Sequence, residues 1–383
     1  MVDDLLGVAE CGHDSLSLNT FINTQIEMKK LLFHTPDEKG KSKCNVMHVG
    51  STKGICPQLQ VHGTQMQQVQ HATYLGDIIS VDGTNDLNIL SRISKGHGKV
   101  TQVMNMLERV TLGSHYFRIA LMLRESIFLN SILNNSEVWY GLLDRQINQL
   151  EMVDRLLVRK FLDAPVSTPV EGVYLELGIL SIGTIIRARR INFLRSLLAA
   201  NENDMTYKVF ITQWNNPVKQ DWVLQVKQDL KAFNIEPNLS NLRERSINSF
   251  KKLVKVKAFE YEFSRLMKAK NGHSKMDNLS YSKLEMQKYL KLENLYASGA
   301  RTLFRYRTRM ANFGENFREG STAVNCPLCG LHLDNQEMAF YNCPVIKANV
   351  KIRGQYEDIF KKNVSTELVN TLDNISKFRE EFH

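Results

Sequence analysis

The chain has 383 residues, of which 43% are hydrophobic and 23% are charged, a composition typical of a folded globular protein. This mix excludes a collagen-like, low-complexity or wholly disordered chain, and the length predicts two or three domains. Lysine and arginine outnumber the acidic residues by 49 to 40. The resulting net charge of +9 is compatible with a polyanionic partner.

The N-terminus indicates the compartment. Met1-Val2-Asp3-Asp4 lacks the basic and apolar segments of a signal peptide, and no stretch has the roughly 18 apolar residues of a membrane span. The sequence therefore predicts an intracellular protein, nuclear or cytoplasmic, with no membrane partner. The chain has six cysteines, and in such a compartment clustered thiols indicate metal ligands rather than disulfides. Nothing in the sequence indicates the oligomeric state.

The first 84 residues combine helical and strand patterns. Apolar residues at helical spacing predict a helix over 17–32. Short apolar runs predict strands at 46–49 and 74–79, and the second run leads into the turn dipeptide Asp82-Gly83. This part is expected to be α+β.

From Asn85 onward, helical patterns dominate and prolines interrupt them. Apolar residues three or four positions apart predict helices, which cover 117–132, 150–157, 185–198, 250–266, 281–313 and 367–382. Pro165, Pro169 and the Asn215-Asn216-Pro217 segment are expected to break the helical runs. The predicted fold class is mainly α with a small α+β N-terminal part.

Two adjacent carboxylates, Asp3 and Asp4, stand between apolar residues near the N-terminus. Carboxylate oxygens are the ligands that Mg²⁺ prefers, and two-metal phosphoryl transfer needs them at the reacting phosphate. Taken alone, such a pair has little specificity. It is followed by Lys43-Cys44-Asn45-Val46-Met47, and then by Tyr74-Leu75-Gly76 before Asp82-Gly83.

In this order, the three motifs resemble the later palm motifs of reverse transcriptases from non-LTR (LINE-type) retrotransposons. The resemblance implies that Asp3 and Asp4 bind Mg²⁺ and that Lys43 lies near the incoming triphosphate. It also implies that Tyr74, Leu75 and Gly76 form a hairpin that holds the primer end. The alternatives are a solvated loop lysine for Lys43 and an edge-strand residue for Tyr74.

The resemblance also implies a domain order. It begins with a palm remnant over 1–84, from the aspartate pair to the primer-grip hairpin, and a helical thumb over 85–200. A basic helical connector over 201–320 and a zinc-knuckle-like segment with a helical tail over 321–383 follow. The family's first palm aspartate and its fingers precede the aspartate pair, and the sequence begins two residues before that pair. We therefore expect the isolated chain to be inactive as an RNA-directed DNA polymerase.

A cysteine cluster near the C-terminus is the second motif. Cys326 and Cys329 have the C-x-x-C spacing at which two thiolates share one tetrahedral zinc ion, and Cys343 follows. The family pattern C-x-x-C…H-x-x-x-x-C has histidine where this chain has Met338, and a thioether is a poor zinc ligand. The sequence leaves two possibilities: Zn²⁺ bound by Cys326, Cys329, His332 and Cys343, or a lapsed site that holds no ion.

A basic segment is the third motif. Arg301, Arg305 and Arg309 are expected on one helical face, where their guanidinium groups can contact phosphate. Phe304 and Tyr306 are expected to stack on single-stranded bases. Smaller basic clusters occur at Arg187, Arg189 and Arg190 and at Lys251, Lys252, Lys255 and Lys257. The alternative for each cluster is a solvated helix face.

These features predict the C-terminal part of a LINE-type reverse transcriptase, with RNA and DNA (template-primer and target DNA) as partners. One alternative is a non-enzymatic nucleic-acid-binding protein derived from a retroelement. The other is an all-α interaction domain whose charge has no partner. Salt-dependent binding to single-stranded RNA separates the first two from the third.

Overall fold

The computed structural model describes residues 45–47, 58–61, 64–110, 113–218, 221–293, 295–317, 324–361 and 363–382. The chain divides into two compact units, Met1–Ser91 and Arg92–His383. Asp3, Asp4, Lys43 and the helix predicted over 17–32 lie outside the described residues.

Short paired strands characterise the first unit. They are β1 (Asn45–Val46), β2 (Gln60–Val61), β3 (Thr64–Gln65), β4 (Gln67–Gln68), β5 (His71–Tyr74) and β6 (Asp77–Ser80). β1 pairs in parallel with β4, while β2–β3 and β5–β6 are antiparallel pairs. Helix α2 (Asp86–Leu107) begins in this unit and continues into the second.

The β5–β6 hairpin has a two-residue turn at Leu75 and Gly76, whose φ angles are +48° and +86°. Positive φ at both turn positions matches the right-handed twist of the flanking strands. The strand predicted over 74–79 is therefore wrong, because the turn divides it. Next to the turn, the buried Asn88 amide donates to the Asp77 carboxylate (3.0 Å) and accepts from the Ile78 N–H (3.3 Å).

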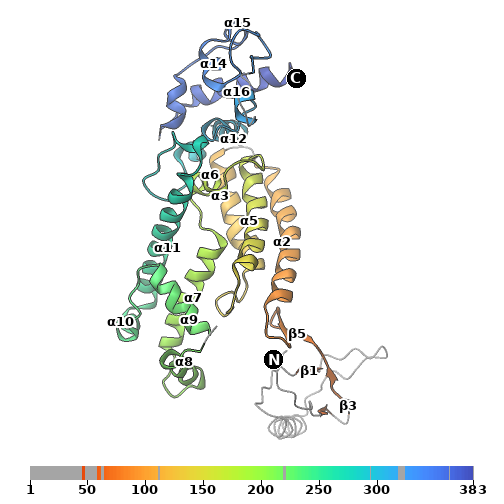
Figure 1. Ribbon diagram of the computed structural model, residues 1–383, viewed down its shortest axis with the longest axis vertical. Coiled ribbons are helices and arrows are strands. Elements are labelled where there is room, and N and C mark those ends of the chain that lie inside the picture. The colour runs from red at the N-terminus through yellow and green to blue at the C-terminus, as the bar shows by residue number, and fades with distance from the viewer. Residues whose placement is uncertain are drawn as a thin grey trace. The chain divides into compact units, whose positions relative to one another are not determined.

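The second unit is built from helices (Figure 1). After α2 they are α3 (Gly113–Leu123), the π-helix η1 (Arg124–Leu129), α4 (Asn130–Ile132), α5 (Asp144–Leu162), α6 (Val170–Leu177), α7 (Ile182–Ala199), α8 (Met205–Asn215), α9 (Trp222–Ala232), α10 (Leu239–Glu244), α11 (Ile247–Lys270), the 3-10 turns η2 (Ser274–Met276) and η3 (Lys288–Lys291), α12 (Ala297–Arg307), α13 (Gly314–Phe317), α14 (Gln336–Tyr341), α15 (Pro344–Asn349), the 3-10 turn η4 (Tyr356–Phe360) and α16 (Thr366–Glu380).

The mainly α fold class is confirmed, whereas one predicted helix is wrong. The pattern over 281–313 predicted a single helix, but among the described residues of that stretch only η3 and α12 are helical. The stretch before η3 instead packs against the end of α6. The Tyr281 hydroxyl donates to the Glu176 carboxylate (2.6 Å), and the Gln287 N–H donates to the Glu176 carbonyl (3.0 Å).

An apolar core joins α7 to α11. It contains Ile191 and Leu194 from α7, Val226 and Leu230 from α9, and Phe250 from α11, all fully buried. Figure 1 shows α7 and α11 side by side, with α8, α9 and α10 at one end of the second unit and α14, α15 and α16 at the other. The boundary predicted at residue 200 falls within this core.

Buried ion pairs join the helices of the second unit. Arg124 forms two hydrogen bonds of 2.7 Å with Asp154, and the Tyr174 hydroxyl donates to the same carboxylate (2.7 Å). Burial, together with this carboxylate, raises the pKa of Tyr174 well above its ordinary value, so the hydroxyl keeps its proton and donates. Such pairs orient helices strongly because an unpaired buried charge is costly.

Candidate metal centre

A tight loop brings Cys326 and Cys329 together. The loop is closed by an antiparallel bridge between Asn325 and Leu333, and the Cys326 N–H donates to the His332 carbonyl (2.7 Å). Within it, the Gly330 N–H donates to the Cys326 carbonyl (2.8 Å), and Gly330 has a φ of +67°. Glycine takes this left-handed conformation without strain, so the sequence Cys-Pro-Leu-Cys-Gly closes a one-turn loop.

Cys343 reaches the loop from the junction of α14 and α15. The side chain of Asn335 caps α14 by accepting from the Met338 N–H (2.7 Å). At the other end of α14, the Cys343 N–H donates to the Met338 carbonyl (3.0 Å), and Pro344 begins α15. Cys343 therefore stands at a fixed corner between two short helices.

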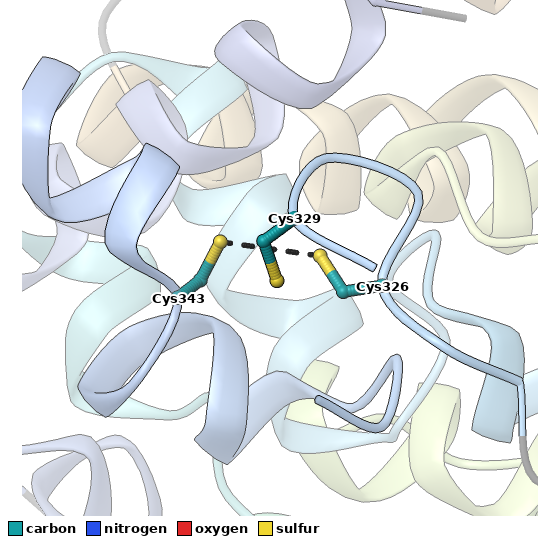
Figure 2. Close-up of side chains that lie close together, drawn as sticks. All are labelled: Cys326, Cys329 and Cys343. Atoms are coloured by element: carbon teal, nitrogen blue, oxygen red, sulfur yellow. Dashed lines mark hydrogen bonds between the residues drawn. The ribbon is translucent and has the colours of Figure 1, made fainter. Parts of the chain in front are cut away.

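The three thiols form one cluster. Their sulfur atoms all lie within 4.8 Å of one another, and the Cys326 and Cys343 sulfurs are 3.9 Å apart. Figure 2 shows the three side chains directed toward one another. Around a zinc ion with Zn–S bonds of about 2.3 Å, two sulfurs of a tetrahedron lie about 3.8 Å apart. The donor set and its spacing therefore fit Zn²⁺, and Cys326, Cys329 and Cys343 would hold it.

The thiols differ in acidity. Burial raises the pKa of the Cys343 thiol to about 11. The nearby Cys326 and Cys329 thiols contribute to this rise, whereas the N–H of Ile346 opposes it. Burial also opposes ionisation of Cys329, but the N–H groups of Leu331 and His332 donate to its sulfur and lower its pKa. Because metals bind thiolates, metal binding at this cluster releases protons.

A buried arginine from α16 lies beside the cluster. Nη1 of Arg379 is 4.0 Å from the Cys326 sulfur, and Nη2 donates to the Asn312 carbonyl (3.1 Å). Its charge is paired with the Asp334 carboxylate (2.9 Å), and its guanidinium lies over the Phe313 ring at 4.2 Å. Sequence reasoning missed Arg379 because it is 53 residues from Cys326 and carries no motif.

The fourth predicted ligand does not join the thiols. Among the described residues, the cluster contains Cys326, Cys329 and Cys343 but not the His332 ring. His332 contributes through its main chain, whose carbonyl and N–H contact Cys326 and Cys329. The grouping of the thiols does not include the His332 ring, and a role for that ring as a zinc ligand stays a prediction. The sulfur of Met338 accepts from the Asn342 amide (3.3 Å).

The arginine side chains of α12 make contacts within the protein, whereas the sequence predicted a face open to phosphate. Nε of Arg301 donates to the Phe161 carbonyl (3.0 Å), and Arg305 forms an ion pair with Asp163. Helix α12 ends at Arg307, and Arg309 lies beyond it with a φ of +51°. The expectation of one helical face carrying Arg301, Arg305 and Arg309 is therefore wrong, although phosphate contact by these residues stays a prediction.

The aromatic residues of α12 cannot stack on bases. Phe304 is fully buried, and Tyr306 is 1% exposed. The Tyr306 ring instead packs edge-to-face on Phe313, with the ring centres 5.8 Å apart. The stacking prediction is wrong because both rings are buried inside the second unit and cannot reach a base.

The palm-motif residues are described only in part. Leu75 is 60% exposed at the tip of the β5–β6 hairpin, Tyr74 is half-buried, and Gly76 completes the turn. A hairpin is present where the resemblance implies one, while primer contact stays a prediction. Asp3, Asp4 and Lys43 lie outside the described residues, so their Mg²⁺ and triphosphate roles also stay predictions.

Comparison with known proteins provides no further assignment. No family model, curated protein sequence or solved structure matches this chain. Among the described residues, no helix combines the length and the apolar character that crossing a membrane requires.

Zinc content tests the cysteine cluster. Purified protein should bind one zinc ion per chain, as measured by metal analysis and by competition with a chromogenic chelator. Changing a metal's outer-shell partners costs about 10- to 100-fold in affinity, so Cys326→Ser or Cys343→Ser should cost at least about 100-fold. Met338→Leu is the matched control and should keep the wild-type affinity, because a thioether contributes little to zinc. Equal zinc content in all four proteins would show that these thiols are not ligands.

Proposed function

We propose that this chain is the C-terminal part of a LINE-type reverse transcriptase that binds RNA and DNA. The observation that carries the proposal is the cluster of Cys326, Cys329 and Cys343, in a segment that follows palm-like motifs in the family's order. Zinc-stabilised loops of this size commonly act as small binding modules, because the ion replaces a hydrophobic core. In this proposal, the metal holds the loop rigid, and the helical unit contacts the nucleic-acid backbone.

The first unit supports the proposal through its hairpin. A two-residue turn presents Leu75, which is 60% exposed, between two short strands. A bulky residue at positive φ is strained by roughly 1–2 kcal/mol, and such strain is concentrated at functional positions. We propose that this hairpin contacts the primer end, while Asp3, Asp4 and Lys43 bind Mg²⁺ and the triphosphate in a complete palm.

Salt-dependent RNA binding tests the proposal. A fluorescently labelled single-stranded RNA should bind the chain, and the logarithm of its affinity should fall linearly with the logarithm of the salt concentration. Each phosphate contact contributes a slope of about 0.7, so four or more contacts should give a slope of at least about 3. Binding of both RNA and primer–template DNA with such slopes is the expected result. Absence of binding at low salt would exclude the proposed function.

A second candidate is an all-α interaction domain, and the arginine contacts favour it. Arg307 forms a buried ion pair with Glu176 (3.0 Å), and Arg187 and Arg190 are both paired with Asp229 (2.7 Å each). These arginines therefore neutralise internal acids rather than face a partner. The two candidates differ in whether other lysine and arginine side chains remain available to contact phosphate groups.

A further inference from the structure

We infer that the exposed lysine face of α11, and not the arginine segment of α12, is the surface that binds the nucleic-acid phosphate backbone. This inference rests on the proposed function and assigns its contact surface. We define the lysine face as Lys251, Lys252 and Lys255, which are all exposed. Arg245, also exposed, precedes it at the junction of α10 and α11.

Positive charge is concentrated at this place in the chain. Residues 243–257 contain six lysines and arginines and a single acidic residue, Glu244. This stretch therefore contributes an excess of five positive charges to a chain whose net charge is +9. Electrostatic attraction to a polyanion depends on such local density rather than on the total charge.

The packing of α11 separates its two faces. Every fourth residue is buried, and these are Phe250, Val254, Ala258, Glu262, Leu266 and Lys270. This stripe packs on α7 and α6. The lysines of the lysine face follow Phe250 and Val254 by one or two positions, so they are directed away from the packed stripe toward solvent.

The lysine face is not neutralised within the described residues. No ion pair there involves Lys251, Lys252 or Lys255, whereas the nearby Lys257 pairs with Glu260 at 2.8 Å. Lys251 and Lys255 are four residues apart, and Lys252 and Lys255 are three apart. Like charges at these spacings repel one another and destabilise a helix. A bound polyanion would offset the repulsion between these lysines, because its phosphate groups attract them.

The base of the surface is rigid. Arg195 from α7 donates through Nη2 to the carbonyls of Arg243 (3.1 Å) and Arg245 (2.8 Å). The Ser246 side chain then caps α11 by accepting from the Ser249 N–H (3.2 Å). The main chain that leads to the lysine face is thus held before any partner arrives, which lowers the entropy cost of binding.

The position of the surface makes it separable from the metal centre. Figure 1 shows α10 at the end of the second unit opposite α14, α15 and α16. The lysine face occupies the first turns of α11, next to α10. Substitutions there should therefore leave zinc binding unchanged, which gives each variant an internal check on folding.

The test uses the full chain and a fluorescently labelled single-stranded RNA across a salt series. The triple variant Lys251→Gln, Lys252→Gln, Lys255→Gln should lose about 2 from the salt slope, since each phosphate contact contributes about 0.7. Its affinity at about 0.1 M salt should fall about 100-fold. The corresponding Lys→Arg triple variant should keep the wild-type slope. The control triple variant Lys95→Gln, Lys160→Gln, Lys291→Gln removes the same charge from three other exposed positions and should lose much less.

The outcomes separate the inference from the proposed function. If wild-type protein does not bind RNA, the proposed function fails and the inference with it. If wild-type protein binds RNA but the lysine-face and control variants have equal slopes, the inference is overturned while the proposed function stands. Vesicles containing phosphatidylserine form the last arm. Loss of vesicle binding in the lysine-face variant with RNA binding unchanged would reassign the surface to anionic membranes and overturn the inference.

Discussion

Gly178→Ala should lower the free energy of unfolding by about 4 kcal/mol or more. Gly178 ends α6 with a φ of +65°, and its main chain lies directly against the segment before η3. A Cβ at this position would lie 2.1 Å from the Met286 nitrogen and 2.2 Å from the Glu285 carbonyl carbon. These neighbours are backbone atoms, and the bond from the Gln287 N–H to the Glu176 carbonyl (3.0 Å) prevents the segment from moving away.

Gly141→Ala is the matched control for this prediction. Gly141 has a similar φ of +63°, but a Cβ there would meet no atom within 4 Å. Its substitution carries only the conformational cost of the left-handed region, about 1 kcal/mol. Urea unfolding followed by circular dichroism measures both variants. Equal destabilisation would show that backbone conformation, and not the close approach of the 285–286 segment, makes glycine necessary at 178.

Asp154→Asn should destabilise the chain by about 3–5 kcal/mol, the cost of leaving a buried charge without its partner. Asp154 is fully buried, and the Arg124 side chain that it pairs with is 3% exposed. An asparagine keeps the shape but removes the negative charge, so the guanidinium loses its counterion in a place that water does not reach. The Tyr174 hydroxyl would also lose a charged acceptor.

Asp163→Asn provides the comparison with the same chemical change. The Asp163 side chain is 64% exposed and pairs with Arg305, which is 32% exposed. Exposed ion pairs contribute at most about 1 kcal/mol because water screens them. Thermal unfolding of the two variants should therefore differ by several degrees, with Asp154→Asn the less stable. Equal melting temperatures would mean that the Arg124–Asp154 pair is accessible to water.

Helix periodicity was the most reliable feature of the sequence. In the helix predicted over 150–157, the apolar residues at helical spacing, Leu150, Val153 and Leu157, are all buried, because such a stripe leaves water only by packing on the rest of the protein. The proline breaks were also correct, since α5 ends at Leu162 and α6 begins at Val170, directly after Pro169. The run over 281–313 failed because contacts with Glu176, more than 100 residues earlier in the chain, prevail over local helical preference.

The sequence by itself determined the helical class and the thiols of the candidate metal centre. C-x-x-C spacing is local, so the approach of Cys326 and Cys329 follows from four residues and a glycine. The tertiary structure alone decided that the three thiols are grouped without the His332 ring and that Arg379 lies beside them. The tertiary structure also decided which lysine and arginine side chains are left without an ion pair among the described residues. A charged residue looks the same in the sequence whether or not an acid neutralises it, because its partner comes from a distant part of the chain. Arg307 pairs with the buried Glu176, whereas Lys251 is exposed and has no ion pair among the described residues.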